Sequence, residues 1–104
     1  MCNILTFKDK SEYSKYEHQM SPLLQSVNAK LIWYGTIEST VIGSNDQGSF
    51  DAVGLVSYPS YKGFLKMVNS DEYKKVAVHR ARGLKGQLLF ACKERPGSTL
   101  QSRL

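Results

Sequence analysis

Short runs of β-branched and aromatic residues recur along the chain at intervals that suit a small sheet. They lie at residues 3–7, 30–36, 51–58 and 87–93, and such runs are typical of strands. We interpret residues 37–42 as a continuation of the second strand. The stretch after it, residues 43 to 49, is rich in Gly, Ser and Asn and predicts the loop of a hairpin.

Helical spacing of apolar residues fills the interval after the first strand. Apolar residues recur three and four positions apart over residues 12–27, which predicts a helix that buries one face. Ser11 is the expected N-cap. Pro22 lacks a backbone N–H and is expected to kink the helix or split it near Ser21.

A second helical region follows the third strand. Spacing predicts one or two helical turns up to Asn69, after which Ser70 is expected to cap a helix that ends near Leu84. The element order β, α, β, β, α, β predicts an α+β, ferredoxin-like fold, with a four-stranded antiparallel sheet in the order 4-1-3-2 and the helices on one face. In that order the start of strand one lies beside the end of strand four, so we expect Cys2 near Cys92.

One arginine interrupts the apolar face of the last predicted helix. At 100° per residue, Arg80 falls near the centre of the cluster that Val76, Ala77, Ala81 and Leu84 form. A charge directed at the core needs a partner or a ligand. Arg80 is therefore the leading candidate for a site.

Two interpretations of Arg80 stay open. In the first it is structural: its stem packs in the core while the guanidinium reaches a carboxylate such as Asp51 or Glu38, or extends to the helix edge. In the second it anchors a carboxylate or phosphate in a pocket. Aromatic residues available to line such a pocket are Tyr13, Tyr16, Trp33, Tyr34, Tyr58 and Tyr73.

Composition agrees with one small domain. The chain has 104 residues, 41% hydrophobic and 22% charged, so we expect a single domain over residues 1–93 and a mobile or docking tail over 94–104. The apolar runs are too short to span a bilayer, and the first residues do not resemble a secretory signal, which predicts a cytoplasmic protein. The net charge of +5 is attributed to a solvated helix face, and a nucleic-acid partner is not expected.

The sequence lacks the motifs of a nucleophile elbow, a phosphate-binding loop and a zinc site. Cys2 and Cys92 give neither a disulfide framework nor zinc-ligand spacing, so we expect no metal or cofactor. His18 and His79 are expected to point away from the apolar faces and to be exposed to solvent. The RNA-recognition fold shares the predicted element order, but Val53 and Leu55 stand where its stacking aromatics would be.

Several motifs in fixed order suggest a relationship. They are Asn3-Ile-Leu-Thr-Phe-Lys-Asp9 with Tyr13 and Tyr16, Phe50-Asp51-x-Val53-x-Leu55-Val56-x-Tyr58-Pro59-Ser60, Phe64-Leu65-x-Met67, Ser70-x-Glu72-Tyr73, Arg80 and Leu84. Together they resemble the dimeric α/β-barrel superfamily, and more closely a small family of unknown function within it. The resemblance implies a homodimer whose two sheets face each other, with a pocket between the sheet and the helices of each subunit.

The superfamily includes cofactor-free monooxygenases, isomerases and haem-degrading enzymes, so the resemblance does not name a reaction. We expect a small anionic or aromatic metabolite bound between sheet and helices by Arg80, Tyr13, Tyr16, Trp33, Tyr58 and Tyr73. Two alternatives stay open: a cofactor-independent monooxygenase or isomerase-like enzyme, and a structural or interaction domain without a ligand. The third predicted strand agrees with the dimer, because neither of its two faces is polar.

Overall fold

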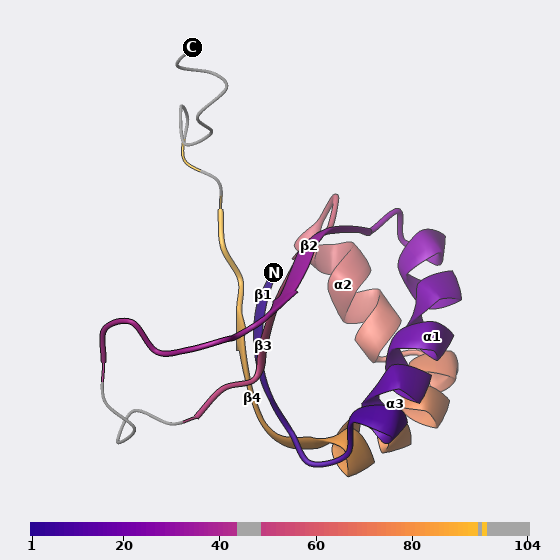
Figure 1. The fold of residues 1–104 in the computed structure, drawn as a ribbon. Coiled ribbons are helices and arrows are strands. Elements are labelled where there is room, and N and C mark those ends of the chain that lie inside the picture. Colours follow the sequence, from indigo (N-terminus) through magenta and orange to yellow (C-terminus); the bar gives the residue numbers. More distant parts are fainter. Residues whose placement is uncertain (44–48, 94, 96–104) are drawn as a thin grey trace.

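The computed structural model describes residues 1–43, 49–93 and 95. Most of the predicted hairpin loop and of the predicted tail lies outside these residues. The described elements follow the predicted order, with the second helical region divided into two helices (Figure 1). They are β1 (Cys2–Phe7), α1 (Lys10–Ser26), β2 (Lys30–Thr36), β3 (Ala52–Ser57), α2 (Tyr61–Val68), α3 (Asp71–Gly83) and β4 (Leu84–Phe90).

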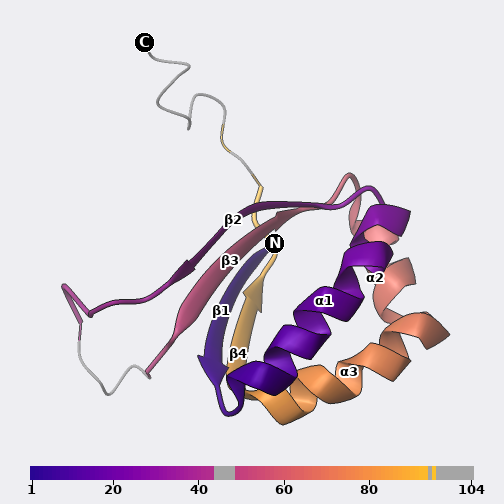
Figure 2. The same cartoon turned by 45° about the vertical axis from the view of Figure 1, so that its right-hand side comes forward.

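The sheet has the predicted topology. Its strand order is β2-β3-β1-β4 with every neighbouring pair antiparallel, which is 4-1-3-2 read from the other edge. All three helices lie on one face of the sheet (Figure 2). The predicted α+β, ferredoxin-like fold is therefore confirmed. Cys2 pairs with Phe90, two residues before Cys92, so the cysteines do not stand directly opposite each other.

The first helix differs from its prediction in two features, the residue that caps its N-terminus and the effect of Pro22. The N-cap is Asp9, whose carboxylate accepts hydrogen bonds from the backbone N–H groups of Ser11 and Glu12 at 3.0 and 3.3 Å. Pro22 lies inside an uninterrupted helix, so the predicted split is wrong. Leu23 beside it packs against the apolar core, and this tertiary packing offsets the missing backbone hydrogen bond.

Two strand boundaries also differ. β2 ends at Thr36 and does not continue to residue 42: Ile37 still donates a backbone hydrogen bond to Asp51 at 2.8 Å, but Val41 and Ile42 are 89% and 94% exposed. A strand persists only where a neighbouring strand takes its hydrogen bonds. β4 begins at residue 84, directly after α3, and ends three residues earlier than predicted.

α1 and α3 approach each other closely at the edge of the core. Gly83 ends α3, and a Cβ built there would lie 2.6 Å from the backbone nitrogen of Tyr13 in α1. The carbonyl of Gly83 also accepts hydrogen bonds from the backbone N–H groups of Lys8 and Asp9, at 2.8 and 3.1 Å. Leu5 and Ala52 pack against Tyr13 from the sheet side. The ends of α1, α3 and β1 are thus held together at one point.

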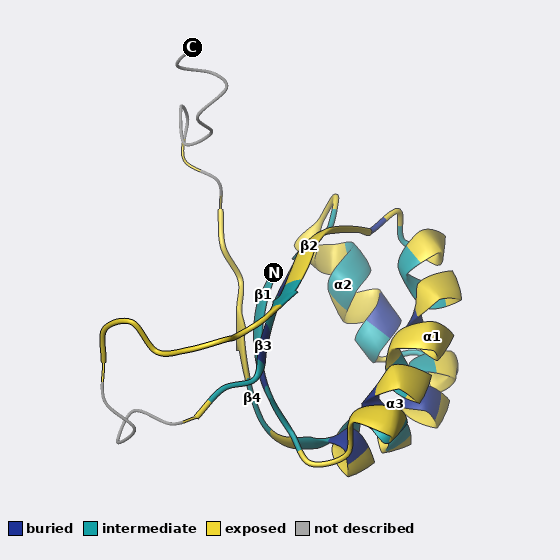
Figure 3. Cartoon of the chain, viewed as in Figure 1, coloured by how far each residue is buried: buried dark blue, intermediate teal, exposed yellow. Residues whose placement is uncertain are grey.

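The face of the sheet away from the helices is apolar and open. Because Leu5 and Ala52 face the helices, alternation directs their neighbours Ile4 and Val53 outward. Figure 3 shows exposed residues along β2 and the end of β4, the two edge strands. Two rows of paired residues cross all four strands on this outer face: Phe90, Cys2, Leu55 and Trp33, and next to it Leu88, Ile4, Val53 and Gly35.

Candidate functional site

Two hollows adjoin between the sheet and its helices. One, of about 160 Å³, lies against α1, and the other, of about 410 Å³, is lined from α2 and α3 as well. We call the two together the interior hollow, because they share a lining. The shared residues are Asn3, Tyr16, Met20, Tyr58 and Gln87.

Arg80 points into this interior hollow, as its helical angle predicted. Its Nη1 donates to Oε1 of Gln87 on β4, while its buried Nε has no hydrogen-bond partner among the described residues. The predicted carboxylate partners are wrong. Asp51 Oδ2 accepts instead from the backbone N–H of Phe7 at 2.7 Å, and Glu38 is exposed. Among the described residues, no carboxylate therefore balances the charge of Arg80.

A row of amide side chains continues from Arg80 across the sheet. Gln87 Nε2 donates to Asn3 Oδ1 at 3.0 Å, and Asn3 Nδ2 donates to the carbonyl of Gly54 at 3.4 Å. Each amide nitrogen in the row has a second N–H to offer, and the guanidinium of Arg80 carries donors and no acceptor. The positive charge of Arg80, with these amide donors beside it, therefore suits an anion.

Tyrosine rings supply most of the remaining wall. Tyr16 and Tyr73 bring their hydroxyl oxygens to 3.4 Å of each other across α1 and α3, and Tyr58 lines both parts of the hollow. Tyr13 is buried at the base, against the sheet. Burial raises the pKa of Tyr13, Tyr16 and Tyr58, so these hydroxyls stay neutral in ordinary buffers and can both donate and accept hydrogen bonds.

Trp33 alone among the predicted lining residues lies elsewhere. Its indole is on the outer face of the sheet, 55% exposed, over Gly35. The pairing of β2 with β3 shifts between Leu31 and Trp33, and this irregularity directs Leu31 and Tyr34 into the interior hollow instead. Simple alternation cannot predict such a shift.

The structure adds three residues that the sequence argument did not assign to the site. Asn3 and Gln87 stand at inward positions of β1 and β4, where an apolar residue is the rule, so strand alternation could have identified them. Glu17 lines the hollow from α1. Burial raises the pKa of its carboxyl group, and the described residues give it no hydrogen-bond or ion-pair partner.

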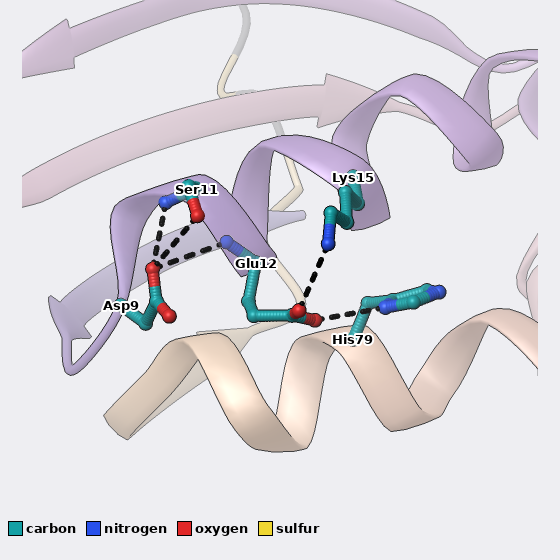
Figure 4. A network of polar contacts seen from close by, with 5 residues as sticks. All are labelled: Asp9, Ser11, Glu12, Lys15 and His79. Atoms are coloured by element: carbon teal, nitrogen blue, oxygen red, sulfur yellow. Dashed lines mark hydrogen bonds and ion pairs between the residues drawn. The ribbon is translucent and has the colours of Figure 1, made fainter.

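The histidines lie outside the hollow. His18 is exposed, as predicted. His79 is only 21% exposed, which corrects its prediction, because its Nδ1 lies 2.9 Å from Oε2 of Glu12. Lys15 Nζ donates to the other oxygen of Glu12 at 3.1 Å (Figure 4). This cluster joins α1 to α3.

The described residues hold neither a cluster of metal ligands nor a helix that could span a membrane. Nowhere in residues 1–43, 49–93 and 95 do three His, Cys, Asp or Glu side chains gather closely enough to hold a metal ion. None of the helices in this part of the chain is both long and apolar enough to cross a membrane.

Comparison with known proteins gives a family and a fold. A family model described as a domain of unknown function, DUF1330, matches residues 1–92, in agreement with the resemblance that the motifs indicated. No curated protein matches the sequence.

Solved structures share the architecture. A protein of unknown function from Rhodopseudomonas palustris, RPA0582, superposes with a TM-score of 0.82 at 22% identity, over 91% of this chain and 81% of that one. Its methylated form gives 0.83 at 22% identity, over 93% and 81%. The Arabidopsis thaliana protein At3g17210 gives 0.63 at 13% identity, over 94% and 96%. At these identities the likeness shows the fold.

Proposed function

This chain belongs to the DUF1330 family of domains of unknown function, and from the geometry of its interior hollow we propose that it is a homodimeric domain that binds a small anionic or aromatic metabolite between sheet and helices. The observation that carries the proposal is Arg80. Its guanidinium reaches into the hollow with a buried Nε, and the part of the chain that the structure describes gives this Nε no hydrogen-bond partner and places no carboxylate in an ion pair with the arginine. Placing a guanidinium in the interior without an anionic partner costs folding free energy, and an anionic ligand that accepts its hydrogen bonds would offset that cost.

The rest of the lining supports the same ligand class. Amide donors of Asn3 and Gln87 lie beside the guanidinium, and the walls are tyrosine and methionine side chains. An apolar cavity with a few convergent polar groups is the usual form of a small-molecule site. The donors would take a carboxylate, phosphate or enolate oxygen, and the aromatic walls would take a planar body.

The outer face of the sheet supports the homodimer. Leu88, Phe90, Leu55 and Trp33 are large apolar residues that are all more than a third exposed on this face, while the helices cover only the opposite face (Figure 2). A soluble monomer rarely exposes a continuous apolar patch of this kind. A second copy, set sheet against sheet, would cover it. A cytoplasmic location is part of the proposal, since two cysteines provide no disulfide framework of the kind typical of small secreted domains.

The replacement Arg80→Met tests the ligand site, because methionine keeps most of the apolar stem and removes the donors. We expect the variant to fold and to melt within a few degrees of the wild type, since only the amide oxygen of Gln87 loses a partner. In a thermal-shift screen of small carboxylates and phosphates, the wild type should be stabilised by at least one compound and Arg80→Met by none.

Arg82→Met is the matched control, because Arg82 is exposed two residues further along α3. It removes the same charge and should leave ligand protection unchanged. If Arg80→Met instead costs about 3 kcal/mol of folding free energy and no compound protects the wild type, the arginine is structural and the domain has no ligand of this class.

A further inference from the structure

The interior hollow has a second charged end. Glu17 lies four residues after Tyr13 and three before Met20, both of which are buried, so the three share one face of α1. Tyr13, Glu17 and Met20 all line the same hollow. Glu17 thus lies at the solvent-exposed border of the buried face of α1, beside the hollow, whereas Arg80 on α3 is partly buried.

No described side chain satisfies this carboxylate. The ion pairs of the described residues join Glu12 to Lys15 and His79, and Asp71 to Lys74, and none of them includes Glu17. Its near neighbours on the wall are the phenols of Tyr13 and Tyr34, which form no hydrogen bond with it. Glu17 is exposed to solvent along much of its length, and partial burial of its carboxyl group against the hollow raises its pKa, so a donor brought by a ligand would be favourable there.

Arg80 and Glu17 have opposite charges and yet do not pair. Arg80 lines the part of the hollow toward α2 and α3, and Glu17 lines the part toward α1 and β2. The side chains that line both parts include the rings of Tyr16 and Tyr58 and the thioether of Met20. One part of the hollow therefore offers the donors of Arg80, the other offers the carboxylate of Glu17, and aromatic and apolar side chains line both.

We propose that the interior hollow takes a small two-ended ligand, with a carboxylate or similar anion at Arg80, a planar apolar body between the tyrosines, and a hydrogen-bond donor, either an ammonium or a phenolic hydroxyl, at Glu17. This inference rests on the proposed function and adds the chemistry of the ligand's second end. Charge-assisted hydrogen bonds to Glu17 favour ligands that carry such a donor over equally sized ligands that lack it.

Three probes separate the two ends: phenylacetate, para-hydroxyphenylacetate and para-(aminomethyl)phenylacetate. Calorimetric titration of the wild type should show at least one of the two-ended probes binding about tenfold more tightly than phenylacetate. Glu17→Gln keeps the size of the side chain and removes the charge. In that variant the tenfold preference should disappear while the affinity for phenylacetate stays the same. Arg80→Met should weaken all three probes.

Glu38→Gln is the control for loss of an acidic side chain, because Glu38 is exposed and does not line the hollow; it should change nothing. If the wild type binds phenylacetate as tightly as both two-ended probes, or if Glu17→Gln keeps the preference, the second end is wrong while the Arg80 site stands. If no probe binds the wild type at millimolar concentration, the inference fails, and absence of protection in the wider Arg80 screen would remove the proposed function separately. The preferred two-ended probe shows whether the donor is an ammonium or a hydroxyl.

Discussion

Glu12 and His79 connect the two long helices through their side chains, outside the proposed ligand site (Figure 4). The hydrogen bond to His79, and next the one to Lys15, lower the pKa of the Glu12 carboxyl group below its ordinary value of 4.5. A lowered pKa in the folded state means that folding favours the ionised carboxylate. The stabilisation is complete above about pH 4.5 and is lost as the pH falls through the lower, folded-state value.

Glu12→Gln should remove this pH dependence. We expect the variant to be less stable than the wild type near neutral pH, and the two stabilities to converge as the solution is acidified below pH 4.5. Urea denaturation at a series of pH values measures the difference. Glu38→Gln, on an exposed residue outside the helices, should run parallel to the wild type. Parallel curves for Glu12→Gln would show that its contacts with His79 and Lys15 contribute nothing to folding.

Single residues of the site were unequally predictable. Arg80 was found because one charge in an apolar helix stripe is visible in the sequence. Its actual partner, Gln87, was not, because the contact depends on how α3 turns directly into β4 at residue 84. Glu17 lies four residues from Tyr13 on α1, but it is exposed. A glutamate on the exposed side of a helix is ordinary in a sequence, and it becomes informative only when the hollow beside it is known.

At the scale of elements, the close contact of α3 with α1 requires a glycine at residue 83, because a larger residue would collide with α1. A Cβ at Gly83 would lie within 2.8 Å of three atoms of Tyr13, two of them backbone, and backbone cannot move aside as a flexible side chain can. Gly83→Ala should therefore push the helix ends apart and destabilise the fold by about 1–3 kcal/mol, even though alanine favours a helix more than glycine does.

Gly86→Ala provides the comparison in β4. A Cβ there would have only the Cβ of Thr6 nearby, at 4.0 Å, so the change should be neutral or slightly stabilising. Chemical denaturation of both variants at one pH measures the difference. Equal stabilities would mean that the helices separate at little cost and that the close approach does not constrain the fold.

The order and type of the elements followed from apolar periodicity, since each element buries one face. Three details did not. Pro22 lies inside α1, where packing supports it. β2 ends at Thr36, and among the described residues no strand pairs with the chain beyond it. The shift in pairing near Trp33 changes which residues face inward. Each depends on contacts between segments distant in sequence, and a single periodic pattern contains no record of those contacts.

At the scale of the whole molecule, the apolar outer face of the sheet makes the homodimer testable. Leu88→Lys places a charge in the middle of this face, opposite Ile4. Sedimentation equilibrium at micromolar concentration should show a dimer for the wild type and a shift toward monomer for the variant, because a lysine buried between two sheets would lack a partner.

Val78→Lys is the matched control, since Val78 is 42% exposed on α3 and Leu88 is 43% exposed on β4. It adds the same charge to the helix side and should leave the dimer unchanged. A wild type that stays monomeric across a dilution series would remove the facing sheets from this proposal.

Because Gly35 has no side chain, the indole of Trp33 can lie over the outer face of the sheet, and this position makes its fluorescence informative. The indole of Trp33 occupies the space where a side chain at residue 35 would be, so it lies along the sheet face proposed to be covered. Trp33 is the sole tryptophan of the chain, and its emission therefore comes from that face alone. A second copy that excludes water should shift the emission to shorter wavelengths, and dilution should reverse the shift, so the unlabelled protein would act as the fluorescent sensor of its own association.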